Sequence, residues 1–299
     1  MNSMKTKKNI LYKIILFRRE MLPTWRKISK KNMRPKKKIP ILHLHLTDHC
    51  NLNCRGCDNF SPLAPETFAD INSFENDCAK MSQLAKGRIE EIQLLGGEPL
   101  LHPQLTRFFE ITRQYFPANT ISVVTNGILL KKQNDNFWES CLKNDIHIIV
   151  TKYPVNIDYK NIEKYAKSRG IKFSYYGNTE FVEKTMQCLP LDLEGKQDAK
   201  DSFLRCSRAN RCISVDNGKL YTCSLIPYVK YFNKHFEKDL NVSPSDYIDI
   251  FNTKDMDEIL NFASRPASFC RYCKMKNTIW DIGFGISKKD ITEWTGINN

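Results

Sequence analysis

A chain of 299 residues that is 41% hydrophobic and 11% aromatic can bury a sizeable core, which excludes a wholly disordered protein and a small disulfide-stapled fold. It has no run of eighteen apolar residues, so a membrane-spanning helix is not indicated. The net charge of +13 belongs to residues 1–38, which hold fourteen of the 46 Lys and Arg and one acid, Glu20. The remainder is neutral and has no basic stripe, so no nucleic-acid partner is expected.

The N-terminal arm, residues 1–38, also carries apolar residues at partly helical spacing, among them Ile10, Leu11 and Trp25. A basic amphipathic helix is typical of a segment that lies on an anionic membrane surface. An acidic electron donor is a second candidate partner, and a solubilising, partly disordered lead-in is an equal alternative. Eleven cysteines without a signal peptide favour a reducing compartment. We therefore expect a cytoplasmic protein, and peripheral contact of the arm with the inner face of the membrane is one of these alternatives.

Beyond Pro40 the chain alternates strand-like and helix-like segments. Short apolar runs predict strands at residues 42–46, 89–95, 121–125, 146–151 and 171–176. Amphipathic segments between them predict helices at residues 73–86, 103–116, 134–144 and 159–168. This alternation predicts βαβ units and a parallel sheet, with ligand sites at the carboxyl ends of the strands.

Three cysteines follow the first predicted strand with the spacing C-x3-C-x2-C: Cys50, Cys54 and Cys57. A compact loop of this kind can present three thiolates to three corners of a cubane iron–sulfur cluster and leave one iron open for reaction. Part of a zinc site that includes His49, or buried structural thiols, are the alternatives.

The second predicted strand ends in Gly96-Gly97-Glu98-Pro99. Paired glycines allow a ligand to approach the backbone closely. The neighbouring carboxylate can accept hydrogen bonds from an ammonium group. Gly-Gly is also a common turn, and it becomes informative because it follows a strand and the cysteine triplet.

With these two motifs, residues 41–176 resemble the core of the radical S-adenosylmethionine (radical SAM) enzymes. The resemblance implies an α/β fold, a partial (β/α)6 TIM-like barrel. It implies a [4Fe–4S] cluster on the three cysteines, S-adenosylmethionine on the open iron, and a flavodoxin or ferredoxin as electron donor. Gly96, Gly97 and Glu98 match the motif that receives the methionyl ammonium.

Two further positions bear on that resemblance. Thr125 and Asn126, at the end of the third predicted strand, resemble the family's cofactor-contacting strand end, although Asn-Gly also makes plain turns. The family usually has an aromatic residue before the third cysteine, and Gly56 stands there instead. We therefore expect the adenine contact to come from elsewhere, with Phe60 as a candidate.

The composition changes near residue 188, which predicts a core over residues 39–187 and a cysteine-rich module with the tail over residues 188–299. Asp216-Asn217-Gly218-Lys219 predicts a hairpin turn inside the module. The cysteine spacing resembles the SPASM module in its short "twitch" form. That resemblance implies a second, auxiliary [4Fe–4S] cluster with four protein thiolates, with Cys212 as the rival of the first ligand; a zinc ribbon is the alternative. The four implied ligands are Cys206, Cys223, Cys270 and Cys273.

The implied activity is reductive cleavage of S-adenosylmethionine to a 5′-deoxyadenosyl radical, which abstracts hydrogen from a small polar substrate such as a sugar, nucleotide-sugar or cyclitol. An auxiliary cluster favours oxidation of that substrate. An epimerase is the related alternative, with Cys188 as candidate hydrogen donor. A maturase of ribosomal peptides and a non-catalytic zinc or iron–sulfur protein are the other hypotheses. His43 and His45 share one face of the first strand and either line the pocket or belong to the core.

Overall fold

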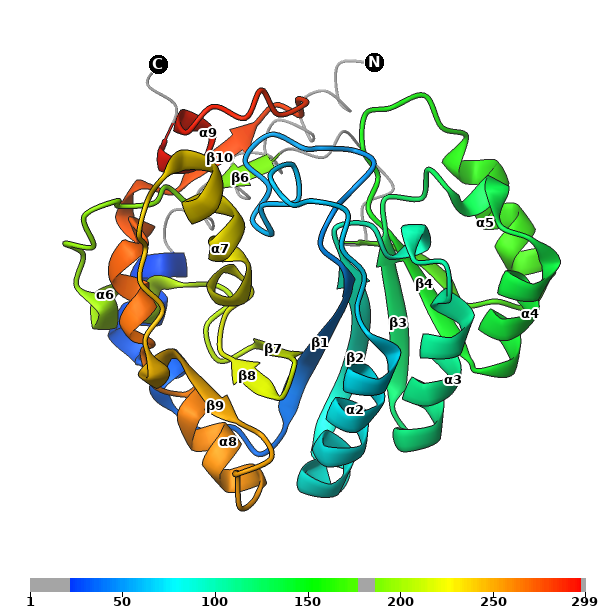
Figure 1. Cartoon of the computed structure of the whole chain (residues 1–299), viewed down its shortest axis with the longest axis horizontal. Helices are drawn as coiled ribbons and strands as arrows, with labels where there is room; N and C mark the ends of the chain where they lie inside the picture. The colour runs from blue at the N-terminus through cyan, green and yellow to red at the C-terminus, as the bar shows by residue number, and fades with distance from the viewer. Residues whose placement is uncertain (1–21, 177–185, 297–299) are drawn as a thin grey trace, which may run out of the picture.

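The structure is a computed structural model that describes residues 22–176 and 186–296. Within these ranges, a curved sheet of eight strands has the order β5-β4-β3-β2-β1-β7-β8-β9 (Figure 1). Its edges are β5 and β9, so the sheet does not close into a full barrel. The strands are β1 (Ile39–Thr47), β2 (Ile89–Gly96), β3 (Thr120–Thr125), β4 (Ile146–Val150), β5 (Phe173–Tyr175), β7 (Cys212–Asp216), β8 (Lys219–Tyr221) and β9 (Tyr247–Asp249).

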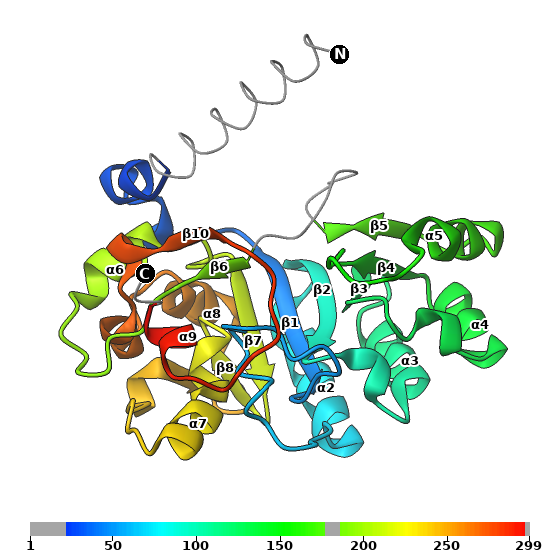
Figure 2. The same cartoon turned by 90° about the horizontal axis from the view of Figure 1, so that it is seen from above.

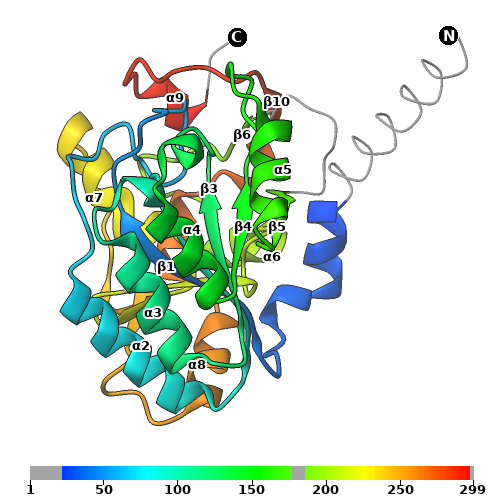
Figure 3. The ribbon, with the colours of Figure 1, turned by 90° about the vertical axis from the view of Figure 1, so that its right-hand side faces the viewer.

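Strands β1 to β5 pair in parallel, and each is followed or preceded by a helix on the outer face of the sheet. Figure 3 shows these helices side by side along that face. They are α2 (Ile71–Ala85), α3 (Leu105–Tyr115), α4 (Asp135–Lys143) and α5 (Tyr159–Ser168). The predicted parallel α/β architecture is therefore confirmed, and the predicted strands and helices agree with the observed ones to within a few residues.

The position of the sixth parallel strand, β7, could not be predicted from the order of the strands along the chain. Strand β7 pairs in parallel with β1, with Cys212 opposite Ile41, so it extends the sheet at the β1 edge and not beyond β5. The predicted hairpin follows, because β8 returns antiparallel to β7 with Asp216 opposite Lys219. Sheet pairing thus continues across residue 188, and the division of the chain near that residue stays a prediction.

Successive side chains of β1 point alternately to the main core and to the inner face of the sheet. Leu42, Leu44 and Leu46 are almost fully buried and belong to the main core under the outer helices. Full burial of one such side chain contributes roughly 1.5–3 kcal/mol. The intervening His43 and His45 point to the inner face, because successive side chains of a strand alternate. The inner face of β1 is therefore the one that carries polar groups.

The C-terminal part packs a second core, which includes Phe60, Tyr228, Phe232 and Trp294, beneath the cysteine loop. Its helices are α6 (Ala199–Arg205), α7 (Leu225–Phe236), α8 (Met256–Ala263) and α9 (Thr292–Thr295). Strands β6 (Met186–Cys188) and β10 (Ile279–Ile282) form a separate antiparallel pair. The 3-10 helices are η1 (Lys31–Met33), η2 (Pro99–Leu101), η3 (Leu130–Lys132), η5 (Pro244–Asp246), η6 (Ser268–Tyr272) and η7 (Met275–Asn277).

The described part of the arm docks on the C-terminal part of the chain, beside α6 (Figure 2). The Asn32 side-chain amide donates to the backbone oxygens of Phe203 at 2.8 Å and Cys206 at 2.9 Å. The Asn210 amide donates in return to the backbone oxygen of Asn32 at 3.0 Å. Ile10 and Leu11 lie outside the described residues. No helix in the described ranges is long and apolar enough to cross a membrane.

Candidate functional site

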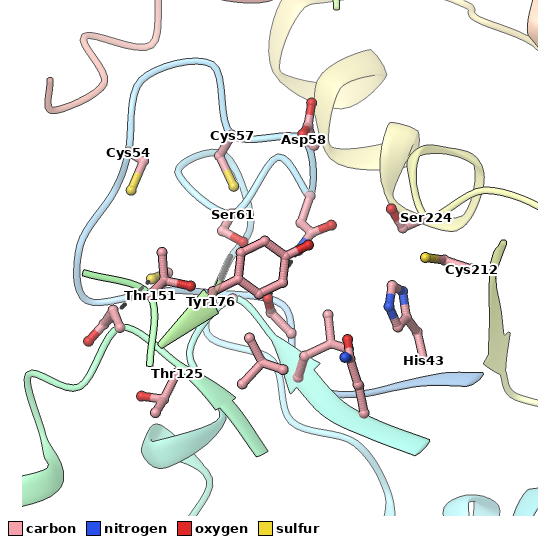
Figure 4. Close-up of a pocket in the computed structure, with 18 of the residues that line it drawn as sticks. His43, Cys54, Cys57, Asp58, Ser61, Thr125, Thr151, Tyr176, Cys212 and Ser224 are labelled. Carbon is pink, nitrogen blue, oxygen red and sulfur yellow. Dashed lines mark hydrogen bonds between the residues drawn. The ribbon is translucent and has the colours of Figure 1, made fainter. Parts of the chain in front are cut away.

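A cavity of about 500 Å³ opens at the carboxyl ends of the parallel strands. Its walls come from the cysteine loop after β1, from the ends of β2, β3 and β4, and from the segment around β7. Figure 4 shows the sulfur atoms of Cys54 and Cys57 inside it. Ten residues singled out from the sequence line this one cavity: His43, Cys50, Cys54, Cys57, Gly96, Gly97, Thr125, Asn126, Cys212 and Cys223.

The cysteine loop presents its thiols to backbone donors and to little water. The Leu52 N–H donates to the Cys50 sulfur at 3.4 Å. Burial, followed by the charge of Glu98, raises the pKa of Cys50 to about 12, and burial also raises the pKa of Cys57. Such thiols ionise only when a cation replaces the lost proton, which is how metal and cluster ligation operates. Three thiols on one wall, of which Cys54 is buried and Cys50 and Cys57 are partly buried, therefore fit an iron–sulfur cluster.

Close backbone contacts leave no room for a side chain at Gly96 or Gly97. A Cβ on Gly97 would lie 2.0 Å from the backbone oxygen of His49, and one on Gly96 would lie 2.2 Å from that of Thr47. The Gly97 N–H donates to the Thr47 oxygen at 2.7 Å. Any side chain here would separate the end of β2 from the start of the cysteine loop. These glycines therefore bring backbone to the cavity wall directly beside the thiols.

Glu98 is placed differently from its two neighbours. Its carboxylate is 1% exposed and accepts hydrogen bonds from Thr125 Oγ1 at 2.6 Å, from the Asn126 N–H at 2.9 Å and from the Leu100 N–H at 3.0 Å. Burial nevertheless raises the pKa of Glu98 to about 7. The carboxylate is not among the groups that line the cavity. It joins the ends of β2 and β3 from behind the wall, so that a bound ammonium would meet the glycine backbone.

Asn126 connects this strand end to the cysteine loop. Its side-chain amide donates to Asn51 Oδ1 at 2.7 Å and approaches the Cys50 sulfur at 3.8 Å. Its side-chain oxygen accepts from the Ile128 N–H at 2.9 Å, which closes a local turn. The turn predicted for Asn-Gly and the cavity-lining role are thus both present in the same residue.

The C-terminal tail covers the cysteine loop from outside. The Arg55 N–H donates to the Gly285 oxygen at 2.7 Å, and the Trp294 indole N–H donates to the Cys57 oxygen at 2.9 Å. Gly56 has a φ of +63°, and a Cβ there would lie 2.8 Å from the backbone oxygen of Glu293. An aromatic residue at position 56 is therefore incompatible with the tail in this position.

A second, narrow cavity lies between α6, α7 and η6. The four cysteines predicted to hold an auxiliary cluster line it, whereas Cys212 lines the larger cavity instead. The Arg208 N–H donates to the Cys206 sulfur at 3.4 Å. Burial raises the pKa of Cys223 to about 12. Within residues 22–176 and 186–296, no three His, Cys, Asp or Glu side chains surround a single-ion position. The four lining cysteines are Cys206, Cys223, Cys270 and Cys273.

Two other residues named from the sequence lie away from the larger cavity. Cys188, in β6, is buried, and its thiol donates to the Glu293 oxygen at 3.5 Å. Phe60 is fully buried against Phe232 and Trp294, so it does not supply an adenine contact. Neither side chain lines the cavity.

The two histidines of β1 have different surroundings. His43 lines the cavity, and burial lowers its pKa to about 4, so its imidazole is neutral at pH 7. His45 lies outside the lining of that cavity and stacks on Tyr228 with 4.4 Å between ring centroids. One histidine thus belongs to the site and the other to the packing beneath it.

Several residues that line the larger cavity were not predicted from the sequence. Tyr153, after β4, pairs with the Cys54 thiol, and burial followed by the charge of Cys54 raises the pKa of Tyr153. Its position after a parallel strand is a signal that would have identified it. Asp58 and Arg208 form an ion pair at the cavity wall and join the cysteine loop to the loop after Cys206. No local pattern indicates that pair.

Comparisons with known proteins bear on the same region. Residues 44–174 match the family model described as radical SAM superfamily. The chain is 34% identical over 93 residues to molybdenum cofactor biosynthesis protein 1 of Bos taurus, a match that covers 30% of this chain and 14% of that protein. It is 30% identical over 136 residues to the probable GTP 3′,8-cyclase of Methanosarcina acetivorans, a match that covers 45% of this chain and 37% of that protein. The chain thus spans well under half the length of either relative.

Among solved structures, the crystal structure of BtrN in complex with AdoMet and 2-DOIA is similar with a TM-score of 0.50 and 16% sequence identity. The similarity covers 80% of this chain and 94% of that one. At 16% sequence identity, this similarity shows that the two chains share a fold.

Proposed function

The chain belongs to the radical SAM superfamily, and from that premise we propose that it cleaves S-adenosylmethionine reductively and oxidises a small polar substrate, such as a sugar, nucleotide-sugar or cyclitol. Membership in the family implies a [4Fe–4S] cluster and S-adenosylmethionine as cofactors. The oxidation, the substrate class and a second cluster are our proposals.

One observation carries the proposal: the three loop thiols and the glycine backbone of Gly96 and Gly97 share the wall of one cavity. We assign Cys50, Cys54 and Cys57 to the cluster, and Gly96, Gly97, Thr125 and Asn126 to the cofactor. Reductive cleavage of the bound cofactor would supply a carbon-centred radical for hydrogen abstraction. The protein's part is to hold the reactants close together and to exclude water, which the tail over the cysteine loop supports.

The second cavity supports oxidation over simple hydrogen return. We propose that Cys206, Cys223, Cys270 and Cys273 hold a fully ligated [4Fe–4S] cluster. Arg208 lines both cavities, so the two sites share a wall. The substrate would lose one hydrogen atom to the 5′-deoxyadenosyl radical, then one electron to the auxiliary cluster and one proton to solvent. A flavodoxin or ferredoxin is the proposed source of the first electron.

The test is anaerobic reconstitution followed by reduction with dithionite. We expect 5′-deoxyadenosine and methionine from S-adenosylmethionine, and about eight irons per chain for two four-iron clusters. Cys54→Ala should abolish cleavage and retain about four irons. Cys141→Ala is the matched control, because Cys141 is a buried thiol of the main core that lines neither cavity. Stoichiometric zinc without cleavage would overturn the proposal.

We also propose that the arm contacts an anionic membrane surface. In its described part, Trp25 is 54% exposed and Ile28 is 74% exposed, next to the basic Arg26 and Lys27. Apolar side chains flanked by cations suit a headgroup interface. Sedimentation with phosphatidylserine vesicles should deplete the wild type more than the Trp25→Ser/Ile28→Ser variant. Equal depletion of both would contradict this contact.

A further inference from the structure

We infer that the substrate carries a phosphate or diphosphate ester, which binds at the Arg211 end of the cavity, while its hydroxyl-bearing part faces the neutral polar residues inside. This inference rests on the proposed function, because it names the substrate class of the same cavity. The two arginines of the cavity wall differ in their pairing with acidic side chains.

Arg208 and Arg211 both line the cavity from the loop that precedes β7. The Asp58 carboxylate neutralises Arg208. Arg211 is exposed, and no acidic side chain in the described part of the chain forms an ion pair with it. One guanidinium of the cavity wall is therefore committed to the protein, and the other is available to a ligand. A guanidinium presents a fork of N–H donors that matches the oxygens of a phosphate.

Other cations reinforce the charge at this end. Burial and then the charges of Lys31 and Arg211 lower the pKa of Lys36. Burial also lowers the pKa of Arg26, on which Cys206 acts to raise the pKa and Arg211, more weakly, to lower it. Cys212 and Glu90 act on the pKa of Lys36 in the opposite sense and are the two weakest contributions to it. Like charges repel one another, and an anion bound to Arg211 would offset part of that repulsion. The rim thus favours a phosphate ester over a neutral group.

Apart from the Asp58–Arg208 ion pair, the interior of the same cavity carries neutral polar groups. His43 is neutral at pH 7, and Gln93, Ser207 and Ser224 add amide and hydroxyl groups to the lining. Figure 4 shows His43 and Ser224 on the side of Cys212, the residue that follows Arg211. Groups that both donate and accept suit the hydroxyls of a sugar or cyclitol. The positive charge at the rim and the neutral hydrogen-bonding groups inside are together complementary to a phosphorylated polyol.

The test uses matched ligand pairs on the reconstituted full chain with S-adenosylmethionine bound. The probes are glucose 1-phosphate against glucose and uridine diphosphate glucose against uridine, with dissociation constants measured by anaerobic calorimetry. We expect the phosphorylated member of at least one pair to bind about tenfold or more tightly than its neutral counterpart. Arg211→Ala should weaken that binding by about 10- to 100-fold, and Arg211→Lys should weaken it less.

Arg265→Ala is the control, because Arg265 is exposed, forms no ion pair in the described residues and lines neither cavity. It should bind as the wild type does. Iron content and the thermal midpoint of Arg211→Ala show whether that variant is folded, and Arg211→Lys keeps the test decisive if it is not. The inference is overturned if no phosphorylated probe binds better than its neutral partner, or if the Arg211 and Arg265 variants behave alike. Cleavage of S-adenosylmethionine by the wild type, measured on the same preparation, tests the proposed function separately.

Discussion

Gly56 and Glu293, which lie 237 positions apart, are in direct contact at the cysteine loop. The Gly56 N–H donates to the Glu293 carboxylate at 3.4 Å, and the same carboxylate accepts from Ser287 Oγ at 2.7 Å. A Cβ on Gly56 would lie 2.8 Å from the Glu293 backbone oxygen. The tail therefore fits the loop only where residue 56 has no side chain.

This contact predicts the effect of Gly56→Ala. A left-handed φ costs a residue with a Cβ roughly 1–2 kcal/mol, and the Cβ would also displace the tail. We expect a lower thermal midpoint and about tenfold slower cleavage of S-adenosylmethionine, measured on iron-loaded protein. Gly283→Ala is the matched control in the same tail, because nothing lies within 4 Å of its Cβ position. Equal behaviour of the two variants would show that the tail does not constrain the loop.

Trp294→Phe tests the second attachment of the tail. It removes the indole N–H that donates to the Cys57 oxygen while keeping an aromatic ring against Phe60 and Phe232. We expect a loss of stability of about 1–2 kcal/mol and faster loss of iron from the cluster in air. Trp138→Phe is the control, since that ring packs in the main core. Iron release at the wild-type rate would mean that this hydrogen bond does not protect the loop.

The ligands of the auxiliary cluster can be separated by iron counting. Cys206 lines the narrow cavity with the three other proposed ligands, and Cys212 lines the larger one. Cys206→Ala should therefore retain about four irons per chain, and Cys212→Ala about eight. The reverse result would exchange the two assignments.

Asp77 gives the fold a pH dependence that can be measured. Its carboxylate accepts from the Gly218 N–H at 2.9 Å at the β7–β8 turn, and burial raises its pKa to about 6 from an ordinary 3.8. The folded state binds the Asp77 proton more tightly than the unfolded state does. The contribution of this proton to folding stability is therefore complete below about pH 4 and is lost as the pH rises through 6. Asp77→Asn should remove about 1–2 kcal/mol of that dependence, seen as a flatter plot of thermal midpoint against pH from 4.5 to 7. An unchanged slope would rule out Asp77 as its source.

Local patterns in the sequence determined the alternating strands and helices, the cysteine triplet after β1, the glycine pair after β2 and the hairpin turn before β8. Each of these depends on neighbours within a few residues, because side chains repeat every two residues in a strand and every 3.6 residues in a helix. Residues placed at the ends of parallel strands then meet at one edge of the sheet. That rule accounts for the cysteine triplet, the glycine pair, Thr125 and Asn126 in the larger cavity, but not for Asp58, Arg208 or Arg211.

Only the tertiary structure decided the contacts between distant segments. It placed β7 beside β1, turned the Glu98 carboxylate behind the cavity wall, paired Asp58 with Arg208 and laid the tail over Gly56. The tertiary structure also placed Cys206 in the narrow cavity and Cys212 in the larger one. These arrangements depend on which surfaces pack together, and packing complementarity between remote segments leaves no periodic signal along the chain.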